Sequence, residues 1–174
     1  GEILDFSASI NPLGYPECVR SAILDRFNDI VNYPDSECSD LRSAIAAKYS
    51  CNEANIMVGN GSNELFYLIP RALKPEHGII LQPTVREFQD ALSSANVEIT
   101  DVMNEDDNFP LFNLHDSQLK ESKGECIIFC NPNNPTGQLI PREEIVKFVE
   151  DNTERFVVID EAFMDFVEEE ERFS

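Results

Sequence analysis

The stretch "IIFCNPNNPTGQLI", residues Ile127 to Ile140, joins an apolar run to a cluster of three asparagines, two prolines and a glycine. The apolar run predicts a buried strand, and the Asn/Pro/Gly cluster predicts a loop at the strand's C-terminal end. Ligands bind at this edge of open α/β sheets. The loop is therefore a candidate binding site.

Strands and helices alternate along the chain on either side of this stretch. Strands are predicted over residues 55–59, 78–83, 97–103, 125–132 and 155–163, and helices over residues 16–27, 39–49, 64–73, 84–95 and 142–152. A polar loop is predicted over residues 104–110. Such alternation predicts an α/β fold with three layers, α/β/α, around a mainly parallel sheet.

The composition of the 174-residue chain excludes several classes of partner. Thirteen basic and 33 acidic residues give a formal charge of −20, which opposes binding to nucleic acid or to anionic membranes. No apolar run is long enough to cross a bilayer, and no signal or transit peptide is recognisable. Five scattered cysteines and two histidines predict no metal site, and we expect reduced thiols in a cytoplasmic protein.

In a parallel sheet, three loops and one strand end gather at the same edge. They are "GNGSNE" (59–64), "QPTVREF" (82–88), "NPNNPTG" (131–137) and "DEAF" (160–163). Each also has a structural interpretation: a strand-to-helix turn that needs glycine, an Asn-Pro turn, or an acidic helix cap or salt-bridge partner. Their shared edge favours a site over these separate explanations.

The chemistry of this set of groups is specific. Amide donors at a helix N-terminus bind a phosphate, an asparagine donates to a phenolic oxygen, and a buried carboxylate pairs with a ring nitrogen. These are the groups that pyridoxal 5′-phosphate requires, because its pyridine nitrogen works as an electron sink only beside an acidic partner.

The motifs "NNPTG", "VVIDEAF" and "GNGSNE", in this order, give the sequence a family resemblance. It resembles the fold-type-I pyridoxal-phosphate enzymes of aminotransferase class I/II, in the histidinol-phosphate aminotransferase branch. Within the branch, "LDFSASINPLG", "NYPD" and "DEAFMDF" are most similar to threonine-phosphate decarboxylases. The resemblance implies a large cofactor-binding domain over residues 36–174, incomplete, preceded by an extended segment and helix over residues 1–35.

The resemblance also implies roles for individual residues. Ser62 and Asn63 are expected to donate to the cofactor phosphate. Asn134 is expected to donate to the ring hydroxyl oxygen and to lie near the substrate, and Asp160 to pair with the ring nitrogen. Tyr33 resembles a tyrosine that reaches the phosphate of the neighbouring subunit, which implies a homodimer.

Other positions depart from the family pattern or concern the substrate. Val85 stands where relatives place an aromatic ring over the cofactor, and Phe163 stands where histidinol-phosphate aminotransferases carry tyrosine. Asn11 to Gly14 matches the segment over the substrate, and Ser9 replaces an asparagine common in decarboxylase relatives.

The family's cofactor-binding lysine is expected downstream of the Asp160 motif. None of the lysines stands there; they are Lys48, Lys74, Lys120, Lys123 and Lys147. We therefore expect an N-terminal portion of an enzyme, with no catalytic residue and no activity of its own. The implied reaction of the whole enzyme is decarboxylation of L-threonine O-3-phosphate to aminopropanol phosphate in cobalamin biosynthesis. The alternatives are a class I/II aminotransferase acting on histidinol phosphate or another substrate, and a non-catalytic α/β binding domain.

Overall fold

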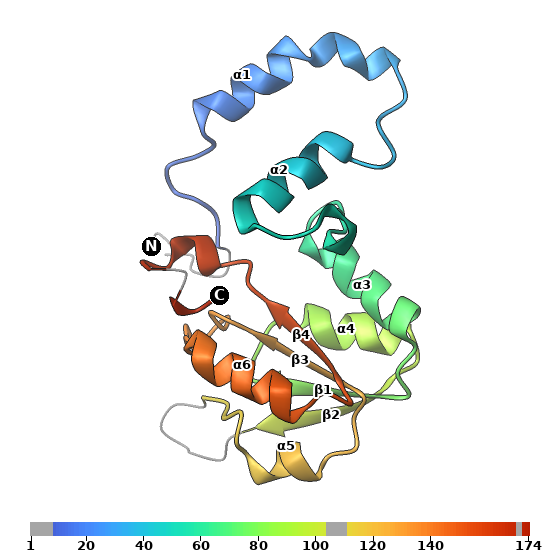
Figure 1. Cartoon of the computed structure of the whole chain (residues 1–174), viewed down its shortest axis with the longest axis vertical. Coiled ribbons are helices and arrows are strands. Elements are labelled where there is room, and N and C mark those ends of the chain that lie inside the picture. Colours follow the sequence, from blue (N-terminus) through green and yellow to red (C-terminus); the bar gives the residue numbers. More distant parts are fainter. Residues whose placement is uncertain (1–8, 104–110, 170–171) are drawn as a thin grey trace, which may run out of the picture. The chain divides into compact units, whose positions relative to one another are not determined.

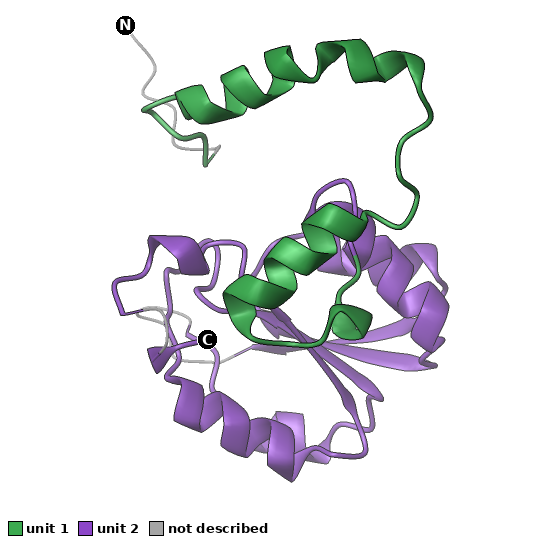
Figure 2. Ribbon diagram, turned by 45° about the horizontal axis from the view of Figure 1, so that its top comes forward, with its two compact units in different colours: residues 1–57 green, residues 58–174 purple. Residues whose placement is uncertain are grey.

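The computed structural model describes residues 9–103, 111–169 and 172–174. Its chain divides into two compact units, residues 1–57 and residues 58–174 (Figure 2). The predicted loop over residues 104–110 and the first eight residues of the predicted N-terminal segment lie outside the described residues. The division into compact units does not test the predicted domain boundary after residue 35, which stays a prediction.

The described part of the first unit, residues 9–57, contains helices and turns. Its elements are α1 (Glu17–Asp25), η1 (Phe27–Val31), α2 (Ser39–Tyr49) and η2 (Glu53–Asn55). Helix α2 begins where Asp35 accepts hydrogen bonds from the backbone N–H groups of Glu37 and Ser39, at 3.0 and 2.8 Å. These bonds lower the pKa of Asp35. Both helices predicted in this unit are confirmed.

The second unit contains a four-stranded parallel sheet. Its strands are β1 (His77–Gln82), β2 (Glu98–Met103), β3 (Cys126–Cys130) and β4 (Phe156–Asp160), in the order β2-β1-β3-β4. Four of the predicted strands are thus confirmed, and so is the parallel sheet.

Helices cover both faces of this sheet (Figure 1). They are α3 (Ser62–Leu73), α4 (Glu87–Ser94), α5 (Ser117–Glu121) and α6 (Arg142–Asp151), followed by η3 (Met164–Phe166). Alternate strand residues enter two separate cores: Ile79 and Phe129 with α5 and α6, and Ile80 and Ile128 with α4. The predicted α/β/α layering is therefore confirmed. None of the described helices is both long and apolar enough to span a membrane.

The strand order reverses between β1 and β3. The chain leaves β1 through α4 to reach β2 on one side, and then returns through α5 to β3 on the other side. The loop after β1 leads to α4 and the loop after β3 leads to α6, and these two helices cover opposite faces, so the two loops diverge at the C-terminal edge. Such a switch point is where ligands bind in open α/β sheets.

The prediction of a strand over residues 55–59 is wrong. Asn55 belongs to η2, and residues 56–59 have no regular structure. A strand exists only where its backbone groups pair with a neighbour. Residues 55–59 pair with none of the described strands, so the apolar run alone does not produce one.

Candidate cofactor site

Asp160 is the last residue of β4 and lies at the C-terminal edge of the sheet. Its Oδ1 accepts the backbone N–H of Ala162 at 3.0 Å, and its Oδ2 accepts the thiol of Cys130 at 3.4 Å. Cys130 is the residue opposite Asp160 on β3. The carboxylate is partly exposed and has a fixed orientation, as a partner for a cationic ring nitrogen requires.

Asn131 closes the loop that follows β3. Its side chain is fully buried, and its Oδ1 accepts the backbone N–H of Ile140 at 2.8 Å. Its Nδ2 donates to the carbonyl oxygens of Ile140 and Phe173, at 3.1 and 3.2 Å. Gln138 adds a second anchor, because its side-chain amide exchanges two hydrogen bonds with the backbone of Phe112. These bonds hold both ends of the loop.

Asn133 joins the loop after β3 to the loop after β1. Its Nδ2 donates to the carbonyl oxygen of Pro83 and to Oγ1 of Thr136, both at 2.8 Å. The side chain is buried, and its Oδ1 has no hydrogen-bond partner among the described residues. The two loops therefore form one structure across the switch point.

Asn134 differs from the other two asparagines of the loop. It is half-buried, and its side-chain amide is not hydrogen-bonded to any described residue. Two asparagines thus hold the loop, and the third leaves a donor and an acceptor available at its surface. The asparagine-rich stretch is both a structural turn and a candidate site.

The loop after β1 contributes Thr84 and Val85. Val85 packs against the core between the sheet and α4, together with Phe66. Thr84 Oγ1 is buried near the Cys130 sulfur but makes no hydrogen bond of ordinary geometry. Neither the unpaired hydroxyl nor the thiol beside Asp160 was expected from the sequence.

Helix α3 begins at Ser62, so Ser62 and Asn63 carry backbone N–H groups that have no acceptor within the helix. The ring of Phe66, one turn further on, lies 4.9 Å from the ring of Phe88 in the first turn of α4. Because α4 starts at the C-terminal edge of the sheet, this contact places the start of α3 toward the same edge. The backbone there turns at Gly61, whose φ of +78° favours glycine.

Glu64 does not compete for a ligand at this helix start. Its Oε2 accepts the backbone N–H of Asn60 at 2.5 Å, which ties the turn to the helix. A Cβ at Gly59 would lie 2.9 Å from Leu65 Cδ2 and 3.3 Å from the same Glu64 oxygen, so a larger residue there would require these side chains to move.

The remaining predicted site residues are Phe163, in the second unit, and four residues of the first unit. Phe163 follows β4 and is half-buried, with its ring 6.4 Å from that of Phe166. In the first unit, Ser9, Asn11, Gly14 and Tyr33 are all exposed. Asn11 forms a turn, since its carbonyl oxygen accepts the N–H of Gly14 at 3.1 Å. The roles of these residues stay predictions.

The available groups match what pyridoxal phosphate needs. The part of the chain that the structure describes offers a fixed carboxylate at Asp160, an unpaired amide at Asn134 and free N–H groups at the start of α3. An apolar side chain, Val85, stands beside them in the loop after β1. The site is therefore that of an α/β protein able to bind a phosphorylated aromatic cofactor.

The family follows from a match along the whole chain. Residues 1–174 match the model of the family "Aminotransferase class I and II", and the chain belongs to this family. It is 34% identical over 99% of its length to threonine-phosphate decarboxylase of Salmonella typhimurium, and 38% identical over 85% to histidinol-phosphate aminotransferase of Clostridium novyi. It is also 34% identical over 99% of its length to the adenosylcobalamin biosynthesis bifunctional protein CobDQ of Leptospira interrogans.

The chain spans only part of each relative. It covers 48% of the decarboxylase, 41% of the aminotransferase and 20% of the bifunctional protein. The crystal structure of histidinol-phosphate aminotransferase from Sinorhizobium meliloti, in complex with pyridoxal 5′-phosphate, gives a TM-score of 0.83 at 23% identity, over 94% of this chain and 45% of that one. This likeness supports a partial domain of the pyridoxal-phosphate transferase fold.

Proposed function

We propose that this chain is the cofactor-binding part of a pyridoxal-phosphate enzyme that decarboxylates L-threonine O-3-phosphate to aminopropanol phosphate in cobalamin biosynthesis. The cofactor is indicated by the family and by its presence in a structural neighbour. The observation that carries the proposal is the fixed Asp160 carboxylate, at the same edge as the unpaired Asn134 amide.

Each proposed cofactor residue has a distinct task. Asp160 would hold a proton at the ring nitrogen through its negative charge, and Asn134 would donate to the ring hydroxyl oxygen. The N–H groups of Ser62 and Asn63 would bind the phosphate, aided by the positive end of the α3 dipole. Val85 would cover one face of the ring and exclude water there.

The cofactor supplies an electron sink for the pair that is left when a bond at the substrate's α-carbon breaks. Electrostatic stabilisation of the protonated ring nitrogen is the chain's main contribution to that chemistry, and it comes from Asp160. Phe163 would contribute apolar surface without the hydroxyl that a tyrosine would bring near the ring oxygen.

The substrate assignment rests on the N-terminal segment and on the motif after β4. Ser9, Asn11 and Gly14, within "SASINPLG", together with "DEAFMDF" from Asp160 on, favour a decarboxylase. Tyr33 would reach the cofactor phosphate of a second subunit, so we propose a homodimer that acts on a phosphorylated amino acid. The described cysteines are free thiols, which agrees with our proposal of a cytoplasmic enzyme.

A histidinol-phosphate aminotransferase is the second candidate, because a relative with that name and a relative named threonine-phosphate decarboxylase have similar percentages of sequence identity to this chain. Assaying the full-length enzyme with both substrates separates the two. We expect release of CO₂ from L-threonine O-3-phosphate. Transfer of the amino group of histidinol phosphate to 2-oxoglutarate without release of CO₂ would contradict the decarboxylase assignment.

A non-catalytic binding domain is the remaining alternative. The reading frame of the whole protein tests it, because an enzyme needs a cofactor-binding lysine downstream of Asp160. We expect such a lysine in the full-length sequence. A natural stop codon close after Ser174 would favour the binding domain.

A further inference from the structure

We propose that Cys130 is a positioning residue whose buried thiol holds the Asp160 carboxylate in the orientation that meets the cofactor's ring nitrogen. This inference rests on the proposed function, because it takes Asp160 as the partner of that nitrogen. It concerns the thiol, to which the family resemblance assigned no role.

The geometry begins with strand register. Cys130 and Asp160 are directly opposite each other on β3 and β4, and paired residues of parallel strands project from the same face. The Cys130 thiol donates to Oδ2 of Asp160 at 3.4 Å, and the N–H of Ala162 donates to Oδ1 at 3.0 Å. Each carboxylate oxygen thus holds one donor and keeps a lone pair for a further one.

The thiol is suited to this task because it stays protonated. Burial, and after it the charge of Asp160, raises the pKa of Cys130 to about 12. The thiol therefore remains a donor across the physiological range and does not become an anion facing a carboxylate. The backbone N–H of Asn134 and the unpaired hydroxyl of Thr84 also lie near the sulfur. The thiol thus lies where Asp160 and the two neighbouring loops come together.

Cys126 provides a natural comparison on the same strand. It lies four residues before Cys130, is fully buried and enters the same core between the sheet and α4. The residue opposite it on β4 is Phe156, so its thiol faces no carboxylate in the register. Truncation of Cys126 removes the same volume from the core without removing a donor from Asp160.

The test measures binding of pyridoxal phosphate to the full-length apoprotein by equilibrium dialysis. The variants are Cys130→Ala, Cys130→Ser, which keeps an O–H donor, and Cys126→Ala as the volume control. We expect Cys130→Ala to weaken binding about fivefold, with Cys130→Ser and Cys126→Ala within about twofold of the wild type. If Cys130→Ala does not fold, Cys130→Val replaces it, because valine fills the space without a donor.

A spectroscopic measurement separates positioning from simple packing. The absorption of the bound cofactor changes with pH, and the charge beside its ring nitrogen affects that change, so the pH dependence of the absorption should differ in Cys130→Ala and be restored in Cys130→Ser. Equal affinities and equal spectra for Cys130→Ala and Cys126→Ala would overturn the inference, as would a Cys130→Ser variant as impaired as Cys130→Ala. If the wild type binds no pyridoxal phosphate, the proposed function itself fails.

Discussion

The loop after β3 and the segment before α3 contain similar residues but are held in different ways. In the loop, Asn131 and Asn133 are buried and bond to backbone groups over 9 and 50 positions of sequence. In the segment, the Asn60 N–H bonds only to nearby Glu64, and Asn60 and Asn63 line an open hollow of about 400 Å³. Buried amide side chains hold the first region, residues 131–140, in a fixed conformation, and we call this region the platform. The second region leaves its backbone N–H groups available to a ligand.

The largest expected effect concerns the carboxylate at the platform's edge. Asp160→Ala in the full-length enzyme should lower the rate at least ~10²–10³-fold, because the charge that stabilises the protonated ring nitrogen is lost. Asp160→Asn should be nearly as damaging, since an amide carries no charge. Steady-state kinetics and circular dichroism measure the rate and the fold. Near-normal turnover in Asp160→Asn would mean that the site is misplaced. The control is Glu161→Gln, which removes a charge from the exposed next residue and should leave the rate near that of the wild type.

The second prediction tests the platform itself. Asn131→Ala should lower the free energy of unfolding of the full-length protein by about 2–3 kcal/mol, because the buried Ile140 N–H loses its acceptor and the cavity stays unfilled. Urea denaturation measures this change. A loss below about 0.5 kcal/mol would show that the loop does not depend on Asn131.

The third prediction concerns Asn134, whose side-chain amide is not hydrogen-bonded to any described residue of the loop. Asn134→Ala should change the free energy of unfolding by less than about 0.5 kcal/mol, because its amide has no partner to lose. The same variant should bind pyridoxal phosphate about tenfold more weakly, since a donor to the ring oxygen is gone. Equilibrium dialysis and urea denaturation of one preparation give both values. An unchanged affinity would remove Asn134 from the site.

The smallest expected effect of a single side chain is on alkaline stability and comes from each of the two buried thiols of β3, Cys126 and Cys130. Burial raises the pKa of Cys126 to about 11, and burial with the Asp160 charge raises that of Cys130 to about 12, from an ordinary 9.0. The unfolded chain therefore releases these protons first. The contribution of these thiols to the free energy of unfolding is fully present below pH 9.0. Above that pH it falls by about 1 kcal/mol per thiol over the first pH unit.

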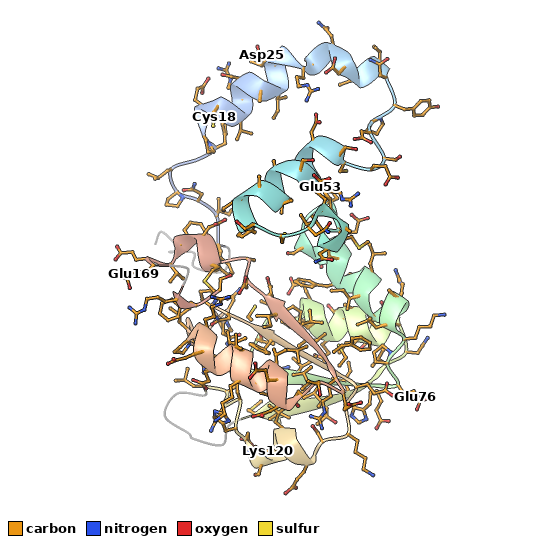
Figure 3. All side chains as sticks on the ribbon, viewed as in Figure 1. Cys18, Asp25, Glu53, Glu76, Lys120 and Glu169 are labelled. Atoms are coloured by element: carbon orange, nitrogen blue, oxygen red, sulfur yellow. The ribbon has the colours of Figure 1, made fainter. Side chains whose placement is uncertain are left out.

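Urea denaturation at neutral and alkaline pH measures this fall. Cys126→Ala should remove about half of it, whereas Cys18→Ala should not alter it, because Cys18 on α1 is exposed (Figure 3). An alkaline decline of equal size in wild type and Cys126→Ala would refute the assignment.

Most of the fold followed from the sequence because the apolar runs are strong and well bounded. The runs that became β1 to β4, and the helices α4 and α6 between them, lie within a few residues of their predicted bounds. The failure at residues 55–59 has a tertiary cause, since strand pairing decides whether a short apolar run becomes a strand.

The candidate site could be predicted only in part. Asp160 stands out because it begins the acidic motif at the end of a predicted strand, and Asn134 because it closely follows one. The Asn133–Pro83 bond and the Cys130–Asp160 pair depend on strand order and register, which periodicity does not supply. One signal was available: Cys130 and Asp160 both end their apolar runs, so in-register pairing of those strands would place them side by side.

A crystal structure of the full-length protein with pyridoxal phosphate tests the central claim most directly. The account predicts the ring nitrogen within about 3 Å of the Asp160 carboxylate, with the Asn134 amide at the ring hydroxyl oxygen and the phosphate at the start of α3. A cofactor held by other residues, with Asp160 still bonded only to Cys130 and Ala162, would contradict it.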